Sequence, residues 1–284
     1  MKMPQYSSYP TIAVRHSSAA RLASDITAKI QTIQDTLPSP DCRAAGIECA
    51  GECERSGNLG GDFFDFLLPR TDQVLAAIGN VALVGITGSL VTTGLHVCLR
   101  LLGSRGVAPA ELSGEINRML WRISPDHAYA TMFCACINPQ RQNLAYVNAG
   151  HETAFILRSD VRMERLEPNG PVLGFSGPVA YRQRVAPFRP GDTLIAVSDG
   201  LSEASEAAAE SGLCEEELLH ILQKKESVRI QELPARVLDT VSRVASAGTK
   251  DKTVIVARYL PSARAAAAVS PAEPWPRRSS GAAA

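Results

Sequence analysis

The chain has 284 residues, 45% hydrophobic and 20% charged, which suffices for one large domain or two small ones. Its 29 basic and 29 acidic residues give a formal net charge of zero, which argues against a nucleic-acid partner or a general attraction to membranes. No apolar run reaches the ~18 residues that a membrane span needs, and residues 1–10 lack the apolar core of a signal peptide. Seven scattered cysteines argue against a disulfide framework and favour a cytoplasmic location.

The two ends of the chain differ in composition from its centre. Residues 1–19 are polar and mixed, which predicts a loose N-terminus. Apolar residues then recur at three- and four-residue steps, which predicts an amphipathic helix from Ala20 to Thr36 within a linker at 20–40. Its stripe, which can pack on the body or on a second copy of the chain, is Leu22, Ile26, Ile30, Ile33 and Leu37. The Ala-, Pro-, Ser- and Arg-rich segment 261–284 predicts a disordered tail.

The segment 41–260 alternates short strand patterns with consecutive helices. Expected strands cover 47–53, 73–81, 129–137, 143–147, 154–158, 179–185, 193–198 and 253–259. Expected helices cover 85–102, 215–225 and 230–245, with a further helix beginning at Pro109. Hairpins separated by paired helices predict an α+β layered domain.

Gly60-Gly61-Asp62 stands directly before a run of aromatic residues. The glycines let the backbone bend tightly, so Asp62 is held at the edge of a core, where a hard cation could bind. An ordinary turn before a strand is the alternative interpretation of this stretch alone. Asp65 and Asp72 are candidate extra ligands, although exposed turn acids are the commoner case, and Glu203 and Glu206 are expected to face solvent.

The order of six short motifs carries a resemblance to a known family. They are Gly60-Gly61-Asp62, Gly79-Asn80-Val81, Asn148-Ala149-Gly150-His151, Pro171-Val172-Leu173-Gly174, Ser198-Asp199-Gly200 and Lys250-Asp251-Lys252-Thr253. From about Leu22 to Arg258 the chain resembles the metal-dependent protein serine/threonine phosphatases of the PPM type (protein phosphatase 2C-like). Within that family it is most similar to the bacterial SpoIIE/RsbU branch, which acts in partner-switching control of sigma factors.

The resemblance implies an α+β fold over residues 41–260, an αββα sandwich of two antiparallel sheets flanked by helices. It also implies two Mn2+ or Mg2+ ions at one end of the sandwich and a metal-bridging hydroxide that attacks phosphorus. Asp62 matches the aspartate that bridges both metals, and Asp199 matches the metal aspartate of the Ser-Asp-Gly motif. Two of the four metal aspartate positions are replaced, by Asn80 and Lys250.

Four further residues line the implied site. Gly61 and Gly200 belong to its motifs, and His151 is expected to have a structural hydrogen-bonding role. Asp251 could substitute for the missing aspartate only by shifting one residue, which usually turns a side chain to the other face of a strand.

The two replacements make the implied site three charge units more positive, because Asp→Asn removes one negative charge and Asp→Lys changes the charge by two. One unit against a divalent ion at ~4 Å is worth roughly 8 kcal/mol at an effective dielectric constant of about 20, before solvation offsets it. Mn2+ or Mg2+ is therefore expected to bind weakly, if at all. The Lys250 ammonium could instead stand in the metal position and pair with Asp62 and Asp199.

Two hypotheses about function remain open, and both place a phosphoserine- or phosphothreonine-bearing protein, such as an anti-sigma-factor antagonist, as the partner. Asn80 and Lys250 favour a regulator of weakened or absent catalysis, a pseudophosphatase, over an active Mn/Mg-dependent phosphatase with an altered metal site. A homodimer through the helix at 20–36 is a further expectation. An α+β domain with an unrelated ligand is the third interpretation.

Overall fold

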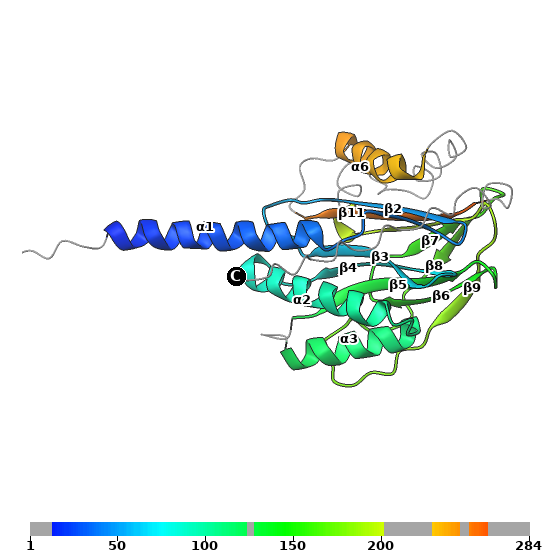
Figure 1. Ribbon diagram of the computed structural model, residues 1–284, viewed down its shortest axis with the longest axis horizontal. Helices are drawn as coiled ribbons and strands as arrows, with labels where there is room; N and C mark the ends of the chain where they lie inside the picture. The colour runs from blue at the N-terminus through cyan, green and yellow to red at the C-terminus, as the bar shows by residue number, and fades with distance from the viewer. Residues whose placement is uncertain (1–12, 124–127, 202–228, 245–249, 261–284) are drawn as a thin grey trace, which may run out of the picture.

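Two antiparallel sheets stacked face to face form the body of the protein (Figure 1). The computed structural model describes residues 13–123, 128–201, 229–244 and 250–260. The six-stranded sheet has the order β1 (Asp41–Ala44), β2 (Ile47–Glu54), β11 (Lys252–Tyr259), β10 (Thr193–Val197), β7 (Ala154–Leu157) and β8 (Met163–Leu166). The five-stranded sheet has the order β3 (Asp62–Arg70), β4 (Gln73–Val81), β5 (Ala130–Asn138), β6 (Asn143–Ala149) and β9 (Arg184–Pro187).

Helices cover the outer face of each sheet (Figure 1). On the five-stranded sheet lie α2 (Gly85–Gly103) and α3 (Pro109–Ile123), whose residues Leu95, Leu112 and Ile116 are fully buried. On the six-stranded sheet lie the short η3 (Ile230–Glu232) and α6 (Leu233–Val244). A third apolar cluster fills the space between the two sheets. The expected αββα sandwich is confirmed.

The strand β3 contributes side chains to two apolar clusters, because successive side chains point to opposite faces of a strand. On β3, Phe64 and Phe66 point into the space between the sheets, while Phe63 and Leu67 point toward the helices. Because side chains alternate across a strand, a residue of β3 faces either the partner sheet or α2, according to whether its number is even or odd.

The helix α1 (Ala13–Thr36) begins seven residues before the expected start, so the predicted loose segment 1–19 is wrong for its last seven residues. No glycine or proline lies between residues 13 and 36 to interrupt the helix. Figure 1 shows α1 projecting beyond the body of the protein. Of the expected stripe, Ile30 is buried, whereas Leu22, Ile26 and Ile33 are 62%, 41% and 47% exposed.

Two other expectations are corrected. The strand expected at 179–185 begins only at Arg184, because the preceding Tyr181 turns inward and donates a hydrogen bond from its hydroxyl to the Pro171 carbonyl (3.1 Å). Contrary to the expectation of no sufficiently apolar run, α2 is long and apolar enough by composition to cross a membrane. In the fold one side of α2 packs on β3 and β4. The helix expected at 215–225 and the tail at 261–284 lie outside the described residues.

Candidate active site

The candidate site lies where strands of both sheets end at the same edge of the sandwich. Asp62 opens β3, and Asn80, near the end of β4, is its direct cross-strand partner. Asp199 follows β10, and Lys250 and Asp251 precede β11, which pairs with β10. Antiparallel pairing within each sheet thus gathers residues from four separate motifs at one edge.

Close backbone approach explains two of the glycines in these motifs. A Cβ atom on Gly60 would lie 2.5 Å from Asp251 Oδ2, and one on Gly200 would lie 2.0 Å from the Asp251 carbonyl oxygen. The clash at Gly200 is with backbone, so that position excludes a side chain, whereas a side chain at Gly60 would force the Asp251 carboxylate to move. Asp251 can sit between the two loops only because both loops carry glycine there.

Neutral donors surround Asp62, which is 5% exposed. The Asn80 side-chain amide donates to Asp62 Oδ1 (2.5 Å), and the Thr253 hydroxyl donates to Oδ2 (2.6 Å). Burial raises the pKa of Asp62 to about 7, against the lowering effect of hydrogen bonds from Thr253, Ser198 and Asn80. The nearby Asp251 carboxylate raises the pKa of Asp62 further.

A lysine ammonium contacts the second retained aspartate. Lys250 Nζ lies 2.8 Å from Asp199 Oδ2, and both side chains are partly exposed. The other oxygen, Asp199 Oδ1, is buried and has no hydrogen-bond partner among the described residues. Asp199 therefore has one oxygen in an ion pair and one that remains a possible ligand.

Asp251 is turned toward the loop that precedes β3. Its Oδ2 accepts hydrogen bonds from the backbone amides of Gly61 (3.0 Å) and Asp62 (3.4 Å), and its Oδ1 accepts one from the Ser56 amide (2.9 Å). The side chain is 6% exposed. Asp251 thus holds the Gly60-Gly61-Asp62 loop in place through hydrogen bonds from its backbone amides.

The side chains around Asp62 and Asp199 do not fit the pair of divalent ions that the family resemblance implies. Such a centre needs several oxygen ligands directed at common points. Over the described ranges, no group of three or more His, Cys, Asp or Glu side chains is arranged to hold a metal ion. Asn80 presents its amide nitrogen to Asp62, and Lys250 places a positive charge beside Asp199.

His151 lies near this edge in a buried position. Its Nδ1 is 3.0 Å from the Thr131 hydroxyl, and its backbone amide donates to Asn148 Oδ1 (2.8 Å). Burial lowers the pKa of His151 to about 4, although the Asp199 carboxylate opposes the shift. The imidazole has Nδ1 beside Thr131 and a buried Nε2 without a hydrogen-bond partner among the described residues, so its structural role stays a prediction.

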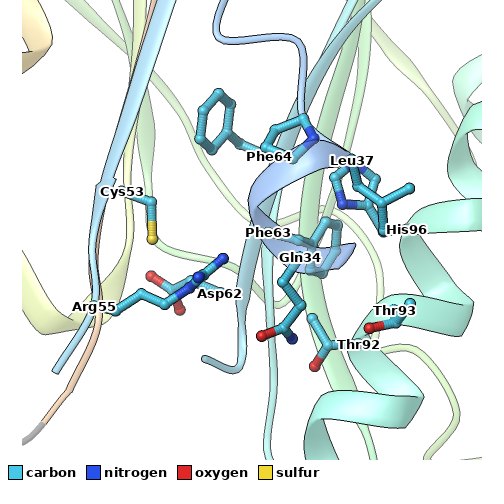
Figure 2. A pocket seen from close by; sticks show the side chains of 11 residues that line it. Gln34, Leu37, Cys53, Arg55, Asp62, Phe63, Phe64, Thr92, Thr93 and His96 are labelled. Carbon is cyan, nitrogen blue, oxygen red and sulfur yellow. The ribbon is translucent and has the colours of Figure 1, made fainter. Parts of the chain in front are cut away.

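The last turn of α1 reaches the candidate site, which the motifs alone did not predict. Gln34, 6% exposed, donates from Nε2 to the Gly60 carbonyl (3.0 Å) and accepts from the Gly60 amide (3.4 Å). The next residue, Asp35, pairs with Arg55. Figure 2 shows Gln34, Arg55 and Asp62 around a cavity of ≈20 Å³, about the space of one water molecule. The only sequence signal was a polar residue inside an otherwise apolar helix stripe.

The expectation of an exposed turn acid at Asp65 is wrong. Asp65 lies in the middle of β3, is fully buried, and faces α2 rather than the space between the sheets. Its odd spacing from Asp62 places the two carboxylates on opposite faces of the strand. Asp72 lies in the turn after β3, partly buried, 3.4 Å from Arg70. Glu203 and Glu206 lie outside the described residues.

Comparison with curated proteins finds two relatives at 26% identity. One is the phosphoserine phosphatase RsbU of Bacillus subtilis, matched over 203 residues that cover 70% of this chain and 59% of RsbU. The other is protein IcfG of Synechocystis, matched over 61% of this chain and 32% of IcfG. The chain thus spans less than two thirds of the length of either relative.

Solved structures share the fold. The RsbU and RsbW domains of a Mycobacterium tuberculosis protein match with a TM-score of 0.68 and 22% identity, over 80% of this chain and 64% of that one. The PP2C domain of SiaA from Pseudomonas aeruginosa matches with a TM-score of 0.65 and 17% identity, over 88% of this chain and all of that one. The family model described as stage II sporulation protein E matches residues 70–260, which is more than half of the chain. The chain therefore belongs to the SpoIIE family of PPM-type phosphatases.

Proposed function

We propose that this protein is a SpoIIE/RsbU-like regulator that acts on a phosphoserine- or phosphothreonine-bearing signalling protein and hydrolyses its phosphate weakly or not at all. The observation that carries the proposal is the 2.8 Å contact between Lys250 Nζ and Asp199 Oδ2. A cation of the chain lies beside a carboxylate that the resemblance assigns to a metal. The amide of Asn80 on Asp62 supports the same conclusion.

Relatives support the proposed class of partner. RsbU and RsbP are named as phosphoserine phosphatases, and one structural neighbour is a structure of the bacterial stressosome. A phosphorylated anti-sigma-factor antagonist, recognised in the cytoplasm within a partner-switching system, is the partner that this kinship suggests.

Hydrolysis of an aryl phosphate in the presence of Mn2+ tests the proposal. We expect the unmodified protein to turn over no faster than its Asp62→Ala variant, because neither binds a metal pair. A phosphoserine peptide titrated into both proteins separates recognition from hydrolysis. Robust turnover by the unmodified protein that is lost in Asp62→Ala would defeat the proposal.

That outcome would establish the alternative, an active Mn/Mg-dependent protein serine/threonine phosphatase with an altered metal site. Asp199 Oδ1, which is buried without a hydrogen-bond partner among the described residues, keeps this alternative open because it leaves one carboxylate oxygen for an ion. Asn80 can supply a neutral carbonyl ligand only if its side-chain amide rotates away from its present contact with Asp62.

We also propose that α1 receives the regulatory input, as a homodimer contact or as the site of a partner. Support comes from the exposed Leu22, Ile26 and Ile33 and from the contact of Gln34 with Gly60. Light scattering should find a dimer that Leu22→Glu/Ile26→Glu converts to a monomer and that Ser24→Glu, a change at an exposed polar position of the same helix, leaves intact. A monomeric unmodified protein would remove the homodimer.

A further inference from the structure

A buried polar cluster on β3, outside the candidate site, holds the corner that follows α1. We define the Asp65 cluster as Asp65, His96, Arg100 and the backbone of Leu37–Ser39. Asp65 Oδ1 accepts from the Ser39 amide (2.9 Å), and Oδ2 lies 2.8 Å from His96 Nε2 and 3.1 Å from Arg100 Nε. A fully buried carboxylate thus joins β3, α2 and the chain that leaves α1.

Arg100 extends the cluster to the end of α1 itself. One terminal nitrogen donates to the Leu37 carbonyl, and the other donates to the Ser39 hydroxyl (2.8 Å). The planar guanidinium therefore contacts Asp65 and two residues of the corner at once, a geometry that a lysine does not reproduce. These guanidinium contacts fix the end of α1 relative to α2.

The same turn of α1 bonds the candidate site on its other side. Gln34 is three residues before Leu37, close to one helical turn, and makes the two hydrogen bonds to Gly60. Between the cluster and the site lies the cavity of ≈20 Å³, lined by His96 on one side and Asp62 on the other (Figure 2). Gln34 lines this cavity, and its two hydrogen bonds to Gly60 hold the side chain there.

We propose that Asp65 is a positioning residue for the candidate site: its cluster with His96 and Arg100 fixes the corner after α1, and through Gln34 it fixes the Gly60–Asp62 loop. Asp65 does not touch Asp62, since the two side chains lie on opposite faces of β3. The inference rests on the proposed function only in taking Asp62 and its loop as the functional site.

Hydrogen exchange of backbone amides tests this coupling with Asp65→Asn, which keeps the side-chain shape and removes the charge. We expect exchange at Leu37, Ser39 and Gly60–Asp62 to accelerate by roughly tenfold or more beyond the rise that β5 and β6 share through the lowered global stability. Asp72→Asn, the same substitution in the turn after β3, is the matched control and should change neither segment.

A second variant separates coupling from general loosening. In a Gln34→Ala background, Asp65→Asn should still accelerate exchange at Ser39. It should add nothing at Gly60, because this background already lacks the hydrogen bonds between Gln34 and Gly60. Acceleration at 37–39 without any change at 60–62 would overturn the proposal, and so would a uniform rise over all strands.

If Asp65→Asn does not fold, Arg100→Lys is used instead, since lysine keeps the positive charge but cannot make the guanidinium's simultaneous contacts with Asp65, Leu37 and Ser39. The same two segments should exchange faster, by about threefold, and no change at 60–62 overturns the proposal. None of these results depends on hydrolysis or on phosphoprotein binding, so the coupling can fail while the proposed function stands, and the reverse.

Discussion

Asp62 and Asp65 lie three residues apart on β3, both buried, and their surroundings differ in kind. Asp65 faces α2 and contacts two cationic or ionisable side chains, His96 and Arg100. Asp62 faces the partner sheet and accepts hydrogen bonds from the neutral Asn80 and Thr253. Burial raises the pKa of Asp62 to about 7. Within the part of the chain that the structure describes, Asp65 has a charged partner, whereas the hydrogen bonds to the Asp62 carboxylate come from neutral donors.

The different partners of Asp65 and Asp62 indicate different roles for the two carboxylates. A buried carboxylate with charged partners from the same chain stabilises a joint, provided that its bonds are satisfied. A buried carboxylate with neutral donors is a costly arrangement unless its position is required for a ligand. The resemblance implies metal ions at Asp62, and we propose that the replacements Asn80 and Lys250 leave this carboxylate buried without them.

The largest expected effect is on the Asp65 side of the comparison. Asp65→Asn should lower the free energy of unfolding by about 3–5 kcal/mol, because the Arg100 guanidinium and His96 lose their carboxylate in a buried setting. Urea denaturation measures the change. Asp72→Asn should stay within about 0.5 kcal/mol of the unmodified protein. A loss below about 1 kcal/mol for Asp65→Asn would show that the cluster does not depend on its charge.

Replacing Asp62 is expected to raise the free energy of unfolding rather than lower it. Its folded-state pKa of about 7 lies above its ordinary 3.8, so the folded state holds the proton more tightly. The stability that this proton contributes is present below about pH 3.8 and is lost as the pH rises through 7. Asp62→Asn should therefore be more stable than the unmodified protein at pH 8, by up to about 4 kcal/mol, and equal to it below about pH 3.5. Destabilisation at pH 8 would contradict the neutral surroundings described for Asp62.

A smaller effect is expected at the link between the two regions. Gln34→Ala should cost about 1–3 kcal/mol, because it leaves the buried carbonyl of Gly60 without its donor. Gln31→Ala, one turn earlier on α1, is the matched control and should cost less than about 0.5 kcal/mol. Equal losses in the two variants would mean that the contact with Gly60 is not what holds α1.

The smallest effect on stability is expected at Lys250. Its side chain and that of Asp199 are 44% and 36% exposed, so the ion pair is screened by solvent and Lys250→Ala should cost less than about 1 kcal/mol. Arg236→Ala, which removes an exposed pair between Arg236 on α6 and Glu232 of η3, should have an equally small effect. A loss above about 2 kcal/mol for Lys250→Ala alone would show that the pair is structural rather than a local replacement of charge.

The sequence predicted the motif positions and most of the long elements, but the nine-residue strand β3 was not among the expected strands. Strands such as β4 and β6 follow from their own apolar patterns, and motif order placed Asp62, Asn80 and Asp199 at strand ends. The four-residue strands β1 and β8 were not predicted either, because they lack the continuous apolar run that marks the equally short β7.

Side-chain partners could not be predicted from spacing. Asp65 was expected to be exposed, and only its position in the middle of a strand reveals that it faces α2. Spacing likewise did not show that Asp251 contacts the Gly61 amide, or that Gln34 on a projecting helix contacts Gly60. Such contacts depend on tertiary packing between segments far apart in the chain.

Calorimetric titration with Mn2+ most directly tests the central claim, that Asn80 and Lys250 replace two metal-binding aspartates of the family and so prevent a metal pair from binding. The unmodified protein should show no binding, and the double variant Asn80→Asp/Lys250→Asp should bind Mn2+, because it makes the site three charge units more negative. Asn80→Asp/Lys252→Asp, which alters the neighbouring lysine instead, is the control. Tight Mn2+ binding by the unmodified protein, or no gain in affinity for the double variant, would contradict the account.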